Sequence, residues 1–224
     1  CSSDLVNKQE QLIVNLRQLD CTTYVENVLA LTLCTENKKL PTFADFCYYL
    51  RMLRYEGGKV DYPTRLHYFT AWISDNTKLG FVHEIQANSA PFTKVQTLDV
   101  DYMSQHIDNY PMLKAHPEWI QAISKMEQQL TGKKFHYIPK AQIANTSLYR
   151  KTIKDGDIIA IITSKKGLDT SHIGIAVWHK DGLHMLNASQ IRHKVVEEPM
   201  PLRTYMSKHP MQIGIRVVRI GKNK

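Results

Sequence analysis

The stretch LDCTTYVENVLAL, residues 19–31, places a cysteine at the start of an amphipathic helix. Apolar residues recur there at helical spacing and form one face: Val25, Val28, Leu29 and Leu33. Asp20 is a typical N-cap residue, so we predict a helix that begins at Cys21 or Thr22. The unpaired N–H groups of the first turn and the positive end of the helix dipole favour a thiolate. Cys21 is therefore a candidate nucleophile.

A histidine that can activate this thiol lies far downstream, in TSHIGIAVW, residues 170–178, which has the pattern of a strand. A Cys–His pair supports nucleophilic catalysis when the two side chains meet. However, a cysteine near a helix start is more often a packing residue, and ten histidines offer many partners. The residues alone leave both interpretations of Cys21 and His172 open.

The composition indicates an ordinary globular chain with a basic surface. Its 224 residues suffice for one substantial core, 43% of them are hydrophobic, and no apolar run approaches the length of a membrane span. The net charge of +8 favours a polyanionic partner such as nucleic acid, anionic lipid or a bacterial envelope polymer. Because the basic residues are dispersed and no nucleic-acid-reading motif occurs, we expect a solvated basic surface and no nucleic-acid partner.

The four cysteines do not predict a disulfide framework or a zinc site, because there is no CxxC pair and no histidine at zinc-finger spacing. Cys34 follows Cys21 on the same helix at a distance of about 20 Å, and Cys34 and Cys47 lie among apolar residues, so we expect both in the core. Cys1 begins the string CSSD, which resembles the start of a mature bacterial lipoprotein. The alternative is that the sequence simply begins at this residue. The histidines other than His172 form no metal-binding motif, so we expect no metal.

The two halves of the chain differ in pattern. Residues 1–150 are expected to be mainly helical, with helices over 42–55, 63–74 and 118–130, while 80–97 alternates like a hairpin or an extended excursion. Residues 151–224 predict an antiparallel set of strands over 157–163, 172–178, 183–189, 191–196 and 213–220, with a turn signal at 180–182. Together they predict one α+β domain, residues 1–224, in which a helical lobe packs against an antiparallel sheet. The candidate cysteine and histidine would meet at this seam.

The strand that follows the turn offers a third polar group for His172. In a hairpin centred near Asp181, His172, Asn187 and Ser189 share one face, because residues of opposite parity lie on the same side. The register decides whether Asn187 or Ser189 reaches the imidazole, and the sequence leaves this open. The alternative is that Asn187 serves a strand end or turn.

Four motifs occur in a distinctive order: DCTTYVE at 20–26, IKDGDII at 153–159, SHIGI at 171–175 and LNAS at 186–189. In this order they resemble the NlpC-type papain-like cysteine hydrolases that cut bacterial cell-wall peptides. Within that group, the chain most resembles the branch called N-acetylmuramoyl-L-alanine amidase-like, over about residues 12–220. The resemblance implies a papain-like α+β fold with a half-barrel sheet.

The resemblance also implies roles for individual residues. Cys21 would be the nucleophile, His172 the general base and acid, and Asn187 the residue that orients the imidazole. Many relatives carry histidine at this third position, and an asparagine carbonyl can also accept from an imidazole N–H. The backbone N–H of Cys21 would contribute to the oxyanion hole.

Residues 62–72, YPTRLHYFTAW, also resemble a signature of this branch. Arg65 would pair with a substrate carboxylate, and Tyr68 and Trp72 would stack on a sugar or form the wall of a peptide site. The expected substrate-binding set is completed by three further residues: Asp20, Tyr62 and Ser171. The alternative is an ordinary amphipathic helix with a solvated arginine.

The resemblance implies a secreted bacterial amidase that hydrolyses the amide between the lactyl group of muramic acid and L-alanine. The reaction would pass through a thioester without metal or cofactor. Peptidoglycan or a muropeptide would be the partner. The protein itself would lie in the periplasm or be an outer-membrane lipoprotein held by a lipidated Cys1. One alternative is an endopeptidase that cuts between D-glutamate and the diamino acid. The other is a non-catalytic module that binds the envelope.

Overall fold

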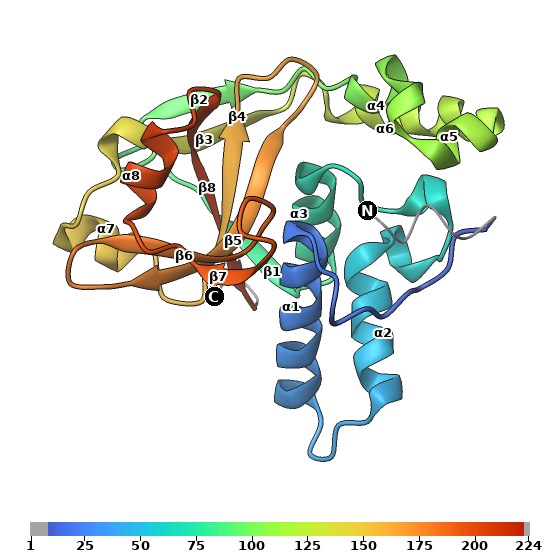
Figure 1. Cartoon of the computed structure of the whole chain (residues 1–224), viewed down its shortest axis with the longest axis horizontal. Helices are drawn as coiled ribbons and strands as arrows, with labels where there is room; N and C mark the ends of the chain where they lie inside the picture. The colour runs from blue at the N-terminus through green and yellow to red at the C-terminus, as the bar shows by residue number, and fades with distance from the viewer. Residues whose placement is uncertain (1–8, 222–224) are drawn as a thin grey trace.

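The computed structural model describes residues 9–221, so Cys1 lies outside the described residues (Figure 1). This part of the chain forms an antiparallel sheet of eight strands in the order β2-β3-β8-β4-β5-β6-β7, with β1 also paired to β8. The strands are β1 Val82–Ile85, β2 Lys94–Thr97, β3 Lys134–Pro139, β4 Ile158–Thr163, β5 Thr170–Trp178, β6 Leu183–Ser189, β7 Lys194–Glu197 and β8 Gln212–Ile220. The predicted α+β class with an antiparallel sheet is confirmed.

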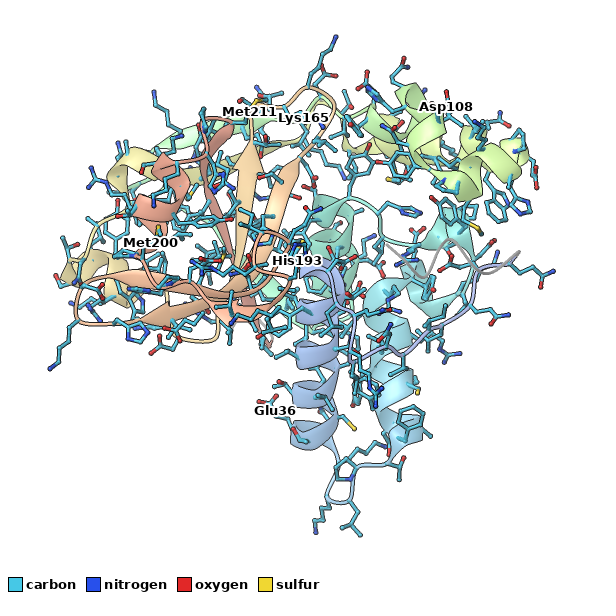
Figure 2. The ribbon with its side chains drawn as sticks, viewed as in Figure 1. Glu36, Asp108, Lys165, His193, Met200 and Met211 are labelled. Atoms are coloured by element: carbon cyan, nitrogen blue, oxygen red, sulfur yellow. The ribbon has the colours of Figure 1, made fainter. Side chains whose placement is uncertain are left out.

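The helices form three groups around this sheet (Figure 1). One face packs against α1 Cys21–Asn37, α2 Phe43–Arg54 and α3 Phe69–Lys78, and the other against α7 Ser147–Thr152 and α8 Leu202–Ser207. The third group has its own small core and comprises α4 Tyr102–Gln105, α5 Pro111–Ala115 and α6 Ile120–Leu130. Figure 2 shows side chains filling the space between the layers, with Asp108 on this third group.

Strand β4 shows why the sheet is covered on both sides. Its uninterrupted Ile/Ala run is buried at every position. Ile158 and Ala160 pack in the core under α1–α3, whereas Ile159 and Ile161 pack in the core under α7 and α8. A strand buried on both faces requires such a run, because polar alternation suits a strand with one wet face.

The hairpin of β5 and β6 has the predicted parity. Ile175 pairs with Leu186, which places His172 on the same face as Asn187 and Ser189. Gly174 lies on this face too, and a Cβ there would approach the Met185 side chain to 2.5 Å. Position 174 therefore requires glycine, because the Met185 side chain occupies the space that a larger residue would need. This space lies on the face of the hairpin that carries His172 and Asn187.

The segment of residues 80–97 is not a hairpin. Strand β1 pairs with β8, and β2 pairs with β3, so the two strands never pair with each other. Strands β1, β2 and β3 all come from the first 150 residues, so the sheet draws on both halves of the chain. Local alternation predicted extended backbone correctly, but the partner of a strand depends on long-range pairing.

The prediction that a helix begins at Pro63 is also wrong. A 3-10 turn over Tyr62–Thr64 is followed by extended backbone, and α3 begins only at Phe69. The Leu66 N–H donates to the Arg54 carbonyl at 3.0 Å, and Tyr55 and Arg65 form an isolated bridge. These bonds to the end of α2 satisfy the backbone in extended form, which removes the need for helical bonds. The strand expected from residue 191 similarly begins at Lys194.

Candidate active site

Helix α1 begins at Cys21, as predicted, because Asp20 and Thr23 form a capping box. The Thr23 N–H donates to the Asp20 carboxylate at 2.7 Å, and the Asp20 N–H donates to the Thr23 hydroxyl at 2.9 Å. This reciprocal pair satisfies two backbone donors and determines where the helix starts. It therefore places Cys21 in the first turn of α1.

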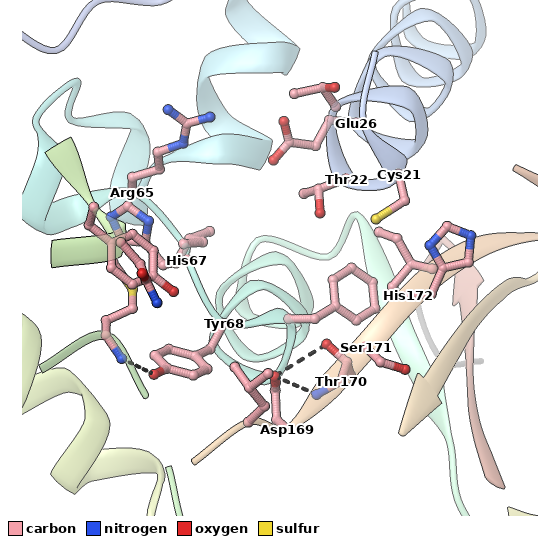
Figure 3. A pocket seen from close by; sticks show the side chains of 18 of the residues that line it. Cys21, Thr22, Glu26, Arg65, His67, Tyr68, Asp169, Thr170, Ser171 and His172 are labelled. Atoms are coloured by element: carbon pink, nitrogen blue, oxygen red, sulfur yellow. Dashed lines mark hydrogen bonds between the residues drawn. The ribbon is translucent and has the colours of Figure 1, made fainter. Parts of the chain in front are cut away.

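A cavity of about 690 Å³ opens beside Cys21 and His172. The two side chains lie at one side of the cavity, Cys21 on α1 and His172 on β5 (Figure 3). The Ile173 backbone also hydrogen bonds with the Cys21 thiol, so the cysteine contacts the residue next to His172. Three further segments complete the lining, residues 62–69, 103–112 and 168–171.

Asn187 is the residue that reaches His172. The imidazole Nε2 lies 2.9 Å from the Asn187 Oδ1, and because this amide oxygen carries no proton, the Nε2–H is the donor. The Asn187 amide cannot be reversed without loss, since its Nδ2 donates to the Val196 carbonyl and the Glu198 carboxylate, both at 3.3 Å. This tautomer leaves the Nδ1 of His172 as the proton acceptor. Ser189 instead accepts from the Arg192 N–H at 3.3 Å.

The charge state of the pair differs from the one that the helix dipole suggested. Burial raises the pKa of the Cys21 thiol, the nearby Asp20 charge raises it further, and hydrogen bonds from Ile173 and Thr22 oppose both effects. Burial also lowers the pKa of His172, against the hydrogen bond to Asn187 and the charge of Glu198. The expected thiolate is therefore wrong for the unliganded protein, because loss of hydration outweighs the dipole. Both directions favour the neutral thiol and the neutral imidazole near neutral pH.

The structure separates the six expected substrate-binding residues into two sets. Tyr62, Arg65, Tyr68 and Ser171 line the cavity. Asp20 caps α1, and Trp72 has no exposed surface and stacks on Phe69 at 4.8 Å in the core. Stacking of Trp72 on a sugar is thus excluded, because the break before α3 turns this side chain into the core.

Two of the lining residues are held by residues distant in sequence. The Arg65 Nη1 lies 3.2 Å from the Glu10 carboxylate, in a largely buried ion pair. The Tyr68 hydroxyl donates to the Glu127 carboxylate at 2.7 Å, and its oxygen accepts from the Met103 N–H at 3.1 Å. Both side chains therefore face the cavity in orientations set by the protein.

The sequence did not identify several other residues at the site. Glu26 lies in the quoted motif, lines the cavity and pairs with the buried Arg54 at 2.7 Å. Asp169 also lines it and accepts from the Thr70 N–H at 2.7 Å. Burial lowers the pKa of His67, another lining residue, to about 3. Residues 109–112 carry no motif, so only their packing brings them to the cavity.

Among the described residues, no helix is both long and apolar enough to cross a membrane.

The chain is an amidase-like protein with an α+β fold and an open antiparallel sheet. The chain belongs to the N-acetylmuramoyl-L-alanine amidase-like family, whose model matches residues 3–215. None of the curated proteins is significantly similar to the chain.

Several solved structures share the fold. An N-acetylmuramoyl-L-alanine amidase from Bacteroides uniformis is 38% identical with a TM-score of 0.88, over 96% of this chain and 90% of that one. A "putative xylanase" from Bacteroides fragilis is also 38% identical, with a TM-score of 0.89, over 98% of this chain and 94% of that one. A protein from Legionella pneumophila, 24% identical, covers 92% of this chain and 76% of its own with a TM-score of 0.66, and it supports the fold alone.

Proposed function

We propose that this protein is a bacterial cysteine amidase of the papain-like, NlpC type. It hydrolyses the amide between the muramic acid lactyl group and L-alanine in peptidoglycan or muropeptides. The observation that carries the proposal is the hydrogen bond between His172 and Asn187, beside Cys21 at the cavity. Membership of the amidase-like family and the similarity to the amidase from Bacteroides uniformis support the choice of bond.

The neutral pair implies that proton transfer accompanies attack. The His172 Nδ1 takes the proton from the Cys21 sulfur as the sulfur bonds to the lactyl carbonyl carbon. The resulting oxyanion accepts from the Cys21 backbone N–H, which has no acceptor within the helix because it lies in the first turn of α1. The carbon–nitrogen bond then breaks, and His172 returns the proton to the departing amine of L-alanine. The same histidine deprotonates a water that hydrolyses the thioester, which releases the lactyl carboxylic acid and restores the thiol.

A glycosidase receives less support from the cavity. Xylan hydrolysis typically requires two carboxyl groups on either side of the glycosidic bond, one of them able to donate a proton. Among the described residues, the carboxylates that line the cavity are Glu26 and Asp169. Glu26 pairs with Arg54, and Asp169 accepts from two backbone N–H groups, so both carboxylates are already engaged by partners within the protein.

Product analysis distinguishes this proposal from the two alternatives. The protein is incubated with a defined disaccharide-peptide muropeptide, and the products are identified by mass spectrometry, with Cys21→Ala as the matched control. We expect an intact muramyl disaccharide and a free peptide that begins with L-alanine. A disaccharide that still bears L-alanine and D-glutamate would instead identify the endopeptidase. Binding of the muropeptide without any turnover would identify a non-catalytic module.

We further propose that the protein acts in the cell envelope, with membrane attachment through a lipid on Cys1. The substrate lies in that compartment, and the CSSD string at residues 1–4 supports the attachment. Metabolic labelling with a radioactive fatty acid should modify the protein expressed with an export signal. A Cys1→Ser variant should lose the label, and retention of the label would contradict the attachment site.

A further inference from the structure

A second cluster of polar side chains lies at the turn of the β5–β6 hairpin. His179 follows β5, His184 lies in β6, and Glu197 ends β7. One nitrogen of each imidazole and one carboxylate oxygen all lie within 4.8 Å of one another. The turn lies at the far end of β5 from His172, about 23 Å along the strand. The cluster is therefore separate from the candidate active site.

The imidazole of His184 is oriented as in a metal ligand. Its side chain is buried, and its Nδ1 lies 2.8 Å from the Glu198 backbone carbonyl. Because a carbonyl can only accept, this Nδ1 carries a proton, and Nε2 is the ring nitrogen that faces the cluster. A bond from the second ring nitrogen to a backbone carbonyl is the usual support of a metal-binding histidine.

The other ring nitrogen of His184 faces the carboxylates of the cluster. The His184 Nε2 lies 3.0 Å from the Asp181 carboxylate, and the His179 Nε2 contacts the Glu197 carboxylate. Two imidazole nitrogens and carboxylate oxygens therefore converge on one point, where a divalent cation could contact all of them.

We propose that His179, His184 and Glu197 bind a first-row divalent cation, of which Zn²⁺ is the probe, with Asp181 as the fourth ligand. Two imidazoles and a carboxylate suit such ions better than Mg²⁺ or Ca²⁺, which prefer oxygen alone. Tetrahedral zinc requires donor atoms about 3.4 Å apart, so exposed Glu197 and His179 need only small rotations. This site ties the hairpin turn to β7 and is structural.

The cation would also stiffen the support of Asn187. Glu197 is followed by Glu198, whose backbone carbonyl binds His184 and whose carboxylate accepts from the Asn187 amide. A cation that holds His184 and Glu197 therefore holds β6 and β7 in register beside that residue. The inference does not rest on the proposed amidase activity, since binding is measured without substrate.

Calorimetric titration of ZnSO₄ tests the proposal. Untagged protein, freed of metal with a chelator, is titrated in a Cys21→Ala background, because a cysteine beside a histidine can also bind zinc. We expect one zinc per chain. His179→Ala and Glu197→Gln should each weaken binding at least about 100-fold, since even outer partners of a metal ligand contribute 10- to 100-fold. His106→Ala removes an exposed imidazole elsewhere and should leave the affinity unchanged.

Thermal unfolding provides a second measurement. Zinc at 100 times its dissociation constant should raise the Tm by about 5 to 10 °C, and neither exposed variant should show this rise. His184→Ala is avoided because loss of a buried side chain can unfold the protein by itself. Absence of stoichiometric binding, or binding that survives His179→Ala and Glu197→Gln, would overturn the proposal and leave the cluster as a set of ion pairs.

Discussion

The two walls of the cavity are built in different ways. The wall with Cys21 and His172 consists of the first turn of α1 and the start of β5, and the buried Asn187 of β6 supports His172. The facing wall consists of residues 62–68, which are largely irregular, and the short helical turns around residues 103–112. Regular elements repeat their geometry, so the positions of side chains follow from spacing along the chain. Irregular segments have no such rule.

Each wall is accordingly held by a different kind of contact. On the first wall, Asp20 and Thr23 cap the helix over three residues, and the hairpin register brings Asn187 to His172. On the facing wall, Arg65 depends on Glu10 and Tyr68 on Glu127, both more than fifty residues away in the chain. Local contacts can be inferred from a sequence, whereas pairs of this separation cannot.

Loss of the thiol should have the largest effect on the first wall. We expect Cys21→Ala to fold normally and to lose essentially all turnover, because Cys21 is the one cysteine among the described residues that line the cavity, and a thioester requires a thiol. Circular dichroism and muropeptide turnover provide the two measurements. Cys34→Ala, which removes a buried thiol away from the cavity, is the matched control and should remain active. Activity in Cys21→Ala would show that this wall is not catalytic.

The hairpin register gives the next largest effect. Asn187→Ala should lower kcat about 100-fold, because the imidazole loses its acceptor and part of the general acid–base contribution. Ser189→Ala changes a neighbour on the same face that accepts from the Arg192 N–H, and it should lower kcat much less. Steady-state kinetics of both variants distinguish them. Equal losses would mean that the hydrogen bond to His172 is not what matters.

The pH profile tests the charge state on this wall. His172 must be neutral to accept the proton, and burial lowers its pKa from 6.5, so kcat/KM should fall to half its maximum only below pH 6.5. On the acidic side of that midpoint kcat/KM should fall about tenfold per pH unit. Thiolate absorbance of the wild type, minus that of Cys21→Ala, should reach half its maximum only above pH 9.0. A thiolate signal already present at pH 7 would instead indicate a preformed ion pair.

The smallest effect is expected on the facing wall. If Arg65 binds a substrate carboxylate, Arg65→Ala should raise KM about 10-fold, which corresponds to a charge-assisted bond of about 1.5 kcal/mol. Glu10→Gln is the control, because it removes the negative charge beside Arg65 but leaves the guanidinium. Amidation of the substrate carboxylate should reproduce the defect of Arg65→Ala in the wild type. Unchanged kinetics would assign Arg65 a structural role in this wall.

The sequence predicted the helices and strands that follow from local patterns of residues. The start of α1 followed from its cap, the strand over residues 157–163 from a continuous apolar run, and the shared face of His172 and Asn187 from alternation. Prediction from the sequence failed where hydrogen bonds to a distant part of the chain determine the local structure. The segment after Pro63 is not helical because Leu66 bonds to Arg54, and this break places Trp72 in the core.

The amino-acid sequence by itself determined the α+β class, the position of Cys21 at a helix start and the strand that carries His172. These depend on interactions within a few residues, which the spacing of side chains reveals. The tertiary structure alone decided the neutral state of the Cys21–His172 pair, the placement of Arg65 and Tyr68 by Glu10 and Glu127, and the meeting of His179, His184 and Glu197. Burial and long-range contacts exist only after the layers have packed, so no pattern along the chain contains them.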